Sequence, residues 1–271
     1  MSDSEELVVL GTGNATVKNC YNTCFALRCG ERVFLVDTGG GNGILHQLDR
    51  AGIPLSAIHD IFLTHKHTDH LLGAVWLIRI IAQQHQRGGY SGVCRIYAHR
   101  ELCELVETLA KLLLQPEQAG ALGDFILLEP VEDCEEREIA GWGVRFFDIH
   151  STKARQFGFR LTLHDEQVLT CMGDEPFNEL NLADVSGSDW LLSEAFCLYS
   201  EADKFKPYEK HHSTVREACE LAQRLKVRHL VLWHTEETHL ARRRELYTAE
   251  GRQYFSGDLH IPDDLDVIQL N

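Results

Sequence analysis

Short apolar runs of β-strand length recur along the whole chain, and many of them end at Gly, Asp or Asn. Runs of this kind, bounded by turn-forming residues, are typical of buried strands. We therefore predict a strand in each of the clearest runs. These cover residues 7–10, 24–28, 33–36, 60–64, 94–98, 125–128, 144–149, 157–163, 168–171, 190–192, 229–233 and 266–270.

Helical patterns lie between groups of these strands, and we predict helices over residues 43–51, 71–86, 100–114 and 213–225. In the last of them the apolar positions 218, 221, 222 and 225 follow the spacing of a helix face. Several strands pass before each helix begins, so the order favours a two-layer or four-layer α/β sandwich over a doubly wound sheet. No Pro- or Ser-rich linker and no fixed repeat occurs, and we predict one domain over residues 1–271.

The composition is that of an ordinary globular protein, with 44% hydrophobic and 25% charged residues. The apolar run 71–81 contains Arg79 and is too short to cross a bilayer. The acidic start, MSDSEELVVL, lacks the basic and apolar regions of a signal peptide. Nine cysteines occur without a CxxC pair, which is typical of reduced thiols. We therefore expect a cytoplasmic protein with no membrane partner.

The formal net charge of −15 limits the classes of partner that the protein is expected to bind. An acidic protein has no general electrostatic attraction for nucleic acid, although a local basic patch can be sufficient for an RNA end. The charge therefore favours a small substrate over a large polyanion.

The segment THKHTDHLLG, at positions 64–73, directly follows an apolar run. In extended backbone, residues two apart point to the same side, so His65, His67 and Asp69 would converge as the chain leaves its strand. His70 would lie at the start of the following helix. Imidazoles and carboxylates are suitable ligands for zinc and similar divalent ions. Four candidate ligands are too many for one open site, which indicates two ions; the alternative is a solvated polar turn.

This segment resembles the H-x-H-x-D-H motif of the metallo-β-lactamase superfamily. Four further stretches resemble the other motifs of that superfamily and follow in the same order. They are FLVDTGG at 34–40, FDIHS at 147–151, LTCMGD at 169–174 and LVLWH at 230–234. The resemblance spans essentially the whole chain and implies a four-layer αββα sandwich with hydrolase activity.

The resemblance also implies a site with two Zn²⁺ ions, with Mn²⁺ or iron as alternatives. One ion would be held by His65, His67 and His150, the other by Asp69, His70 and His234, with Asp174 bridging them. Two cations would lower the pKa of a water molecule and neutralise charge that develops on the attacked centre. Asp69 is expected to serve catalysis as well as metal binding. Asp37 would hold no ion and would instead orient a ligand histidine or the neighbouring turn.

Two later stretches resemble the ribonuclease Z branch of the superfamily: residues 189–196, which include a Glu-Ala pair, and residues 210–222, which begin KHHST. In that branch a histidine contacts the scissile phosphate and protonates the leaving oxygen, supported by a glutamate. Glu194 and His212 are the matching positions. A carboxylate beside a histidine raises its pKa and fixes its orientation, which makes it a better acid. His211 is the alternative inward-facing histidine, and a plain helix-entry loop is the alternative for both.

Two departures from the branch bear on the substrate. Bacterial members that process tRNA carry a long arm between the third and fourth motifs, but here only 23 residues separate His150 from Asp174. The Gly-Asp pair is also followed by Glu175, where the branch commonly has Thr. We therefore expect a dinuclear-zinc phosphodiesterase acting on a small phosphodiester, of cyclic nucleotide or cyclic phosphate type.

Three other functions are compatible with the sequence. The first is a tRNA 3′-processing endoribonuclease, and the second is a thioester, lactone or β-lactam hydrolase that uses the same metals. The third is a metal-binding sensor or scaffold without catalysis.

Local positive charge surrounds the expected site. Lys153 and Arg155 follow His150, and Lys210 precedes the two histidines. With His211 they are candidate substrate-binding residues, because cationic groups suit phosphate; ordinary solvated surface is the alternative. The helix 71–86, which carries Trp76, is expected either to pack in the core or to form the interface of a homodimer.

Overall fold

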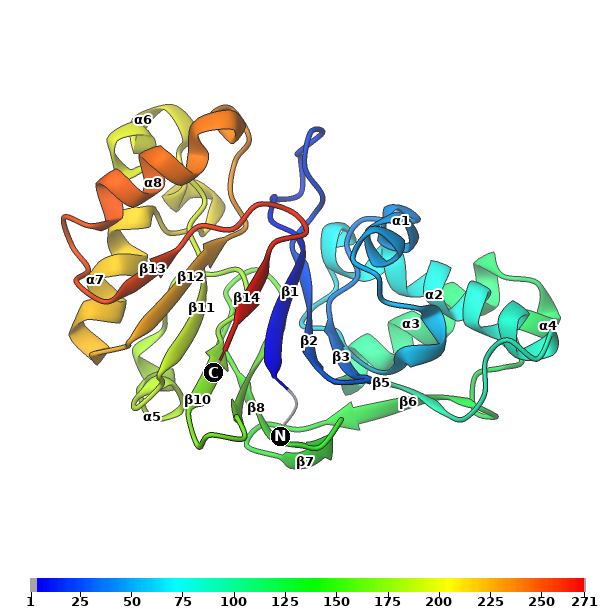
Figure 1. Cartoon of the computed structure of the whole chain (residues 1–271). Coiled ribbons are helices and arrows are strands. Elements are labelled where there is room, and N and C mark those ends of the chain that lie inside the picture. Colours follow the sequence, from blue (N-terminus) through cyan, green and yellow to red (C-terminus); the bar gives the residue numbers. More distant parts are fainter. Residues whose placement is uncertain (1–3, 271) are drawn as a thin grey trace.

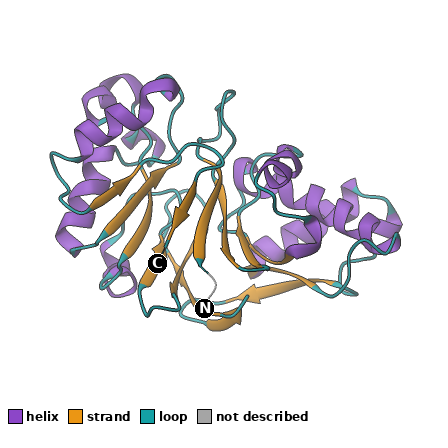
Figure 2. Cartoon of the chain, viewed as in Figure 1, coloured by secondary structure: helices purple, strands orange, loops and turns teal. Residues whose placement is uncertain are grey.

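The computed structural model describes residues 4–270, and its framework is a pair of seven-stranded sheets that face each other with helices on both outer sides (Figures 1 and 2). The first sheet has the strand order β14-β1-β2-β3-β4-β5-β6. Its strands are β1 (Glu5–Gly11), β2 (Cys24–Cys29), β3 (Arg32–Val36), β4 (Ile58–Phe62), β5 (Cys94–His99), β6 (Ile126–Val131) and β14 (Val267–Gln269).

The second sheet has the order β13-β12-β11-β10-β9-β8-β7. Its strands are β7 (Glu136–Ile139), β8 (Trp142–Asp148), β9 (Phe157–Thr162), β10 (Val168–Cys171), β11 (Trp190–Glu194), β12 (His229–Trp233) and β13 (Asp258–His260). The α-helices are α1 (Gly43–Arg50), α2 (Thr68–Gln86), α3 (Arg100–Leu113), α4 (Pro116–Ala119), α5 (Leu182–Val185), α6 (Ala202–Phe205), α7 (Val215–Leu225) and α8 (Arg243–Gly251).

Three apolar cores separate the four layers. Side chains alternate along each strand, so in β1 Leu7 and Val9 face the second sheet, while Val8 and Leu10 face α1 and α2. The central core between the sheets is rich in aromatic rings, and a third core packs α7 and α8 onto the second sheet. The expected four-layer αββα sandwich is confirmed.

Most predicted elements lie within two or three residues of the observed ones, and β10 and β12 have the predicted bounds. The helix predicted over 71–86 begins at Thr68 and packs its apolar face into the core, while Trp76 remains 39% exposed. The prediction missed β7, β13, α8 and the short helices, whose sequences are polar or shorter than one clear period. Within residues 4–270, no helix is both long and apolar enough to cross a membrane.

The strand directions bring the chemically important residues to one edge of the sandwich. Strands β3, β4 and β5 are parallel to one another, as are β10, β11 and β12. In parallel strands the carboxyl ends lie on the same edge, and loops there commonly build a ligand site. The segments after β3, β4, β10, β11 and β12 carry all but one of the expected metal ligands and the Glu194–His212 pair.

The central core yields the first testable prediction. The ring of Phe159 is fully buried between the sheets, with centroids 5.6 Å from Phe34 and 5.8 Å from Phe62. Truncation in Phe159→Ala leaves a cavity that both sheets line, and we expect it to lower the free energy of unfolding by about 3–5 kcal/mol. Urea unfolding measures the change. The control Leu112→Ala removes a side chain that is 75% exposed and should change stability by less than about 0.5 kcal/mol.

Candidate active site

The expected ligand atoms gather in two groups at this edge, and a further group joins Asp174 and His234 to His212. The atoms of His65, His67 and Asp174 lie within 4.8 Å of one another, and so do those of Asp69, His70 and His234. Asp174 lies between the groups. Its Oδ1 is 3.7 Å from Nε2 of His65, and its Oδ2 is 3.4 Å from Nε2 of His234 and 3.7 Å from Nε2 of His70. The structure thus brings six of the seven expected ligands together in these two sets, and their role as metal ligands stays a prediction.

A close approach of α2 to the loop after β3 sets the position of this motif. The N–H of Gly73 donates to the carbonyl oxygen of Gly39, and a Cβ at Gly73 would lie 2.0 Å from the carbonyl oxygen of Thr38. Only glycine permits this contact without a shift of the backbone. The first turn of α2, which carries Asp69 and His70, is thereby held against the turn that begins at Asp37.

Asp37 connects both segments through its carboxylate. Its Oδ1 accepts a hydrogen bond from the N–H of Thr64, and its Oδ2 accepts one from the Thr64 hydroxyl, both at 2.8 Å. The same Oδ2 lies 2.7 Å from Nδ1 of His70. With Nδ1 engaged, Nε2 of His70 is directed at the acidic cluster. A carboxylate behind a ligand histidine fixes the ring and raises its basicity, which strengthens metal binding.

His65 has a comparable support that the sequence did not reveal. Its Nδ1 lies 2.9 Å from the hydroxyl oxygen of Thr64 and 3.1 Å from Nε2 of Gln156. Its Nε2 therefore faces His67 and Asp174. Gln156 is buried just before β9, and nothing in its local pattern distinguished it from other loop residues.

The electrostatic environment favours the protonation states that metal binding needs. Burial lowers the pKa of His65 and His67, and it lowers that of His234 to about 3, so these imidazoles are neutral at pH 7. Burial alone would raise the pKa of Asp174, but its histidine neighbours outweigh that effect and hold the pKa well below its usual range. Ligand histidines must be neutral and ligand carboxylates ionised.

The pKa values of the two remaining ligands, Asp69 and His70, depend on each other, and that of His70 also depends on Asp37. Burial lowers the pKa of His70, but the charge and hydrogen bond of Asp37 outweigh it and raise that pKa well above its ordinary value. Burial raises the pKa of Asp69, but the proximity of His70, whose Nε2 lies 3.3 Å from Oδ2 of Asp69, outweighs it, so the net direction is downward. Both carboxylates therefore favour positive charge at this position.

Two buried polar atoms support the fit of a cation. Nε2 of His70 and Oδ1 of Asp174 are buried and have no hydrogen-bond partner among the described residues. Such orphaned atoms are rare in native proteins, and a cation in each of the two positions would satisfy them. Nitrogen and carboxylate donors around a buried position suit zinc and related divalent ions.

His150 lies outside both groups. It follows β8 as predicted, but its side chain is exposed and its backbone has a φ of +57°, in the left-handed region. Its N–H donates to Oδ1 of Asp148 at 2.8 Å. The structure thus does not bring this histidine to the cluster, and its role as a ligand stays a prediction.

Glu194 and His212 lie beside the metal cluster. Glu194 is buried at the end of β11 and accepts hydrogen bonds from the N–H (2.5 Å) and the hydroxyl (2.8 Å) of Ser213. Its Oε2 faces Nδ1 of His212 at 3.6 Å, and both atoms are buried without another partner in residues 4–270. Burial raises the pKa of Glu194, while the nearby His212 and the hydrogen bonds from Ser213 oppose this effect. The His212 ring stacks on Phe196, with centroids 5.0 Å apart, and lies 5.3 Å from the ring of His234.

An open pocket of about 540 Å³ lies over the cluster. Two of the candidate substrate-binding residues line it and two do not. Lys153 and Lys210 line this pocket together with His212. His211 is exposed, does not line the pocket and has its Nδ1 2.8 Å from the hydroxyl oxygen of Thr152. Of the two adjacent histidines, His212 therefore faces the site.

Arg155 also lies away from this pocket. It pairs with Asp148 at 3.5 Å, and its guanidinium lies over the ring of Phe157. Glu175, the residue that departs from the branch pattern, is buried. It accepts hydrogen bonds from the hydroxyl of Ser151 (2.5 Å) and the N–H of Thr152 (3.1 Å), so it fixes the loop that presents Lys153.

Comparison with known proteins agrees with this fold. The chain is 28% identical to a ribonuclease Z of Thermococcus sibiricus over 98% of this chain and 96% of the relative. The metallo-β-lactamase fold protein YhfI of Bacillus subtilis superposes with a TM-score of 0.79 at 18% identity, covering 98% of this chain and 100% of the other. A diphosphatase of the PhnP family superposes with a TM-score of 0.73 at 18% identity, covering 100% and 98%.

The protein is a metal-dependent hydrolase of the metallo-β-lactamase fold, related to ribonuclease Z. Within that class, residues 5–255 match the model of the family described as anti-Pycsar protein Apyc1. The chain belongs to this family.

The support given by Asp37 generates the second prediction. Asp37→Asn keeps the size of the side chain but removes the carboxylate that faces Nδ1 of His70, so His70 loses its fixed orientation. We expect zinc affinity to fall about 10–100-fold, measured by competition with a chromophoric chelator. Asp124→Asn changes an exposed carboxylate and should leave the affinity unchanged. Equal affinity in both variants would contradict the role assigned to Asp37.

Proposed function

We propose that the protein is a dinuclear zinc phosphodiesterase that hydrolyses a small phosphodiester, of cyclic nucleotide or cyclic phosphate type. The observation that carries this proposal is the Glu194–His212 pair beside the metal cluster. A phosphodiester with an alkoxide leaving group needs a proton donor at that oxygen, whereas an activated ester or β-lactam does not need one to the same degree. A carboxylate–histidine pair next to a two-metal ligand set supplies such a donor.

The ligand residues proposed for the two ions are His65, His67, His150, Asp69, His70, His234 and Asp174. Bound divalent ions make hydroxide available near neutral pH and neutralise charge on the phosphoryl group. Zinc suits the donors best, and Mn²⁺ or iron would use the same nitrogen and oxygen ligands.

The roles of the protein's own groups follow from their positions. Glu194 fixes Nδ1 of His212, so Nε2 of that ring gives its proton to the leaving oxygen. Lys153 and Lys210, which line the pocket, bind the non-bridging oxygens of the phosphate. Asp69 takes part in catalysis through its position at the metal cluster. His211 and Arg155 would contact only a substrate that extends beyond the pocket.

The small size of the substrate is supported by the segment between His150 and Asp174. It forms strands β9 and β10, which pair antiparallel with Val168 opposite Thr162, so no arm extends from this place. A pocket of about 540 Å³ has the size of a small-molecule site. The net charge of −15 also disfavours a long polyanion.

A second candidate is tRNA 3′-end processing, which the name of the Thermococcus relative favours. It would require tRNA to be held without the usual arm. Cleavage of a precursor tRNA at its 3′ end would support it, and a failure to bind tRNA even at low salt would exclude it.

We further propose that the protein is cytoplasmic and forms a homodimer. Trp76 on α2 and Leu112 and Leu113 on α3 are exposed apolar side chains of the first helical layer. Sedimentation equilibrium measures the association state, and a monomer at micromolar concentration would contradict the proposal.

The activity is tested with the zinc- or manganese-loaded protein, with cyclic nucleotides and bis(p-nitrophenyl) phosphate as substrates. We expect metal-dependent turnover of both. His212→Ala should reduce kcat for a cyclic nucleotide about 10²–10⁴-fold. It should reduce kcat much less for bis(p-nitrophenyl) phosphate, because p-nitrophenolate leaves without a proton.

The matched control for this test is His46→Ala, which removes an exposed histidine of α1 and should leave both rates unchanged. Turnover of a thioester or lactone alone, unaffected by His212→Ala, would favour acyl hydrolysis instead. Absence of turnover of every phosphodiester would reject the proposed function.

The ligand role of His150 has its own test. If a rearrangement of the loop at 150–155 brings this histidine to the ions, His150→Ala should bind one zinc ion firmly, whereas the wild type binds two. Native mass spectrometry counts the ions. Two firmly bound ions in the variant would show that His65, His67 and Asp174 hold the first ion without it.

A further inference from the structure

The loop between β1 and β2, residues 12–23, forms part of the wall of the metal pocket. Asn14, Ala15 and Thr16 line this pocket together with the metal ligands. Figure 1 shows the loop, in blue, rising beyond the ends of β1 and β2 between the two helical layers. A molecule bound over the metal ligands therefore has this loop beside it.

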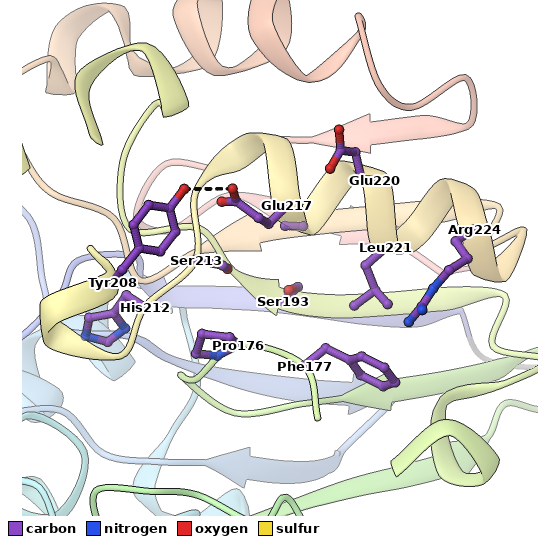
Figure 3. Close-up of a pocket in the computed structure, with 11 residues that line it drawn as sticks. Pro176, Phe177, Ser193, Tyr208, His212, Ser213, Glu217, Glu220, Leu221 and Arg224 are labelled. Carbon is purple, nitrogen blue, oxygen red and sulfur yellow. Dashed lines mark hydrogen bonds between the residues drawn. The ribbon is translucent and has the colours of Figure 1, made fainter. Parts of the chain in front are cut away.

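The neighbouring pocket on the other side of His212 does not involve the loop. That second pocket has a volume of about 390 Å³ and lies between α7 and residues 176–177 (Figure 3). Of the residues that line either pocket, only His212 lines both. Of these two pockets, the β1–β2 loop therefore borders the metal pocket alone.

The base of the loop is joined to the segment that follows His234. The N–H and the side-chain Nδ2 of Asn14 both donate to the carbonyl oxygen of Thr235, at 3.0 and 3.1 Å. The N–H of Thr235 in turn donates to the carbonyl oxygen of Thr12 at 3.0 Å. Asn14 is buried, and its Oδ1 accepts a hydrogen bond from the N–H of Thr16 at 2.8 Å. These contacts fix the base of the loop without any charged side chain.

The tip of the loop has a different anchor, which is the carboxylate of Glu237. Its Oε2 accepts hydrogen bonds from the N–H of Lys18 at 2.9 Å, from the N–H of Asn19 at 2.7 Å and from Nδ2 of Asn19 at 3.1 Å. Within residues 4–270 these two N–H groups have no other acceptor. Residues 15–19 belong to no helix or strand, so no ladder of backbone hydrogen bonds holds the tip.

The charge of Glu237 strengthens this anchor. The N–H groups of Lys18 and Asn19 lower the pKa of Glu237, so its side chain is ionised near neutral pH. Hydrogen bonds to an ionised carboxylate are about twice as strong as those between neutral groups. One side chain after β12 thus holds the part of the loop that its own backbone leaves unsupported.

We propose that Glu237 is a positioning residue, which holds the tip of the β1–β2 loop against the metal pocket so that Ala15 and Thr16 contact the bound substrate. The proposal rests on the proposed phosphodiesterase function and adds to it a residue that controls substrate affinity. Glu237 acts through the loop, because it does not line the pocket itself.

The loop acts on binding rather than on the chemical step. The proposed proton donor His212 and the expected metal ligands have supports that do not include Glu237. A contact between the loop and an organic group of the substrate is made equally in the ground state and the transition state. Its loss therefore raises KM and leaves kcat unchanged. Inorganic phosphate carries no organic group, so its binding is independent of the loop.

The test measures kcat and KM of the zinc-loaded protein with bis(p-nitrophenyl) phosphate. Glu237→Ala removes the anchor and should raise KM about threefold to tenfold, while kcat and the zinc content keep their wild-type values. Glu237→Gln retains an acceptor oxygen for the two backbone N–H groups, so its KM should lie closer to that of the wild type. Inhibition by inorganic phosphate should be equal in all three proteins.

The matched control is Asp165→Ala. Asp165 also accepts a backbone N–H, that of Gln167 at 3.1 Å, but it lies in the turn before β10, at the edge opposite the metal ligands. This variant should leave KM and kcat unchanged. The proposal is overturned if Glu237→Ala keeps the wild-type KM, if it lowers kcat or the zinc content, or if it weakens inhibition by inorganic phosphate as much as it raises KM.

Hydrogen exchange separates this proposal from the proposed function, because it needs no substrate. If the wild type hydrolyses no phosphodiester, the proposed function fails. Amide exchange at Lys18 and Asn19 is then combined with calorimetry of phenyl phosphate and inorganic phosphate. Faster exchange in Glu237→Ala, with weaker binding of phenyl phosphate alone, supports the positioning role. Unchanged exchange, or unchanged affinity for phenyl phosphate, overturns it.

Discussion

The carboxylate of Asp37 is the point on which the geometry of the site depends. It joins the end of β3 to the end of β4 through Thr64 and to the first turn of α2 through His70. Three segments are thereby held by one buried side chain, and the hydrogen bond from Gly73 to Gly39 holds α2 against the loop after β3. The positions of His65, His67, Asp69 and His70 follow from this junction, because all of them lie within the short connection that it holds at both ends.

Asp174 and His234 follow strands of the second sheet. The distance between the two sheets therefore determines whether they reach the ligands that follow the first sheet. That distance is set by the aromatic core. The rings of Phe25 on β2 and Trp233 on β12 stack with centroids 4.7 Å apart, directly before the turn that carries His234. A well-packed interior resists compression and expansion. The stacked pair therefore connects core packing to the spacing of His70 and His234 across the two sheets.

The sequence was sufficient to predict the parts of this site that depend on local backbone periodicity. The period of two in extended backbone correctly placed His65 and His67 together. It was wrong for Asp69, which lies in the first turn of α2 and groups with His70 and His234 instead. The inward orientation of His212, left open beside His211, is settled by a left-handed backbone at His211 (φ +56°) that no propensity indicates. Gln156 and Glu175 were not recognised as supports, because their contacts join segments distant in sequence. The position of His150 depends on a loop conformation, which apolar periodicity does not describe.

The two pockets that His212 lines differ in the chemistry of their other lining residues. On the metal side, carboxylates and neutral imidazoles favour the binding of cations. Lys153 and Lys210 add positive charge to this pocket, in a protein whose net charge is −15. On the other side of His212, the lining is aromatic and mildly acidic. Under the proposed phosphodiesterase function, the phosphate would therefore lie on the metal side of His212, because the acidic lining on the other side repels an anion.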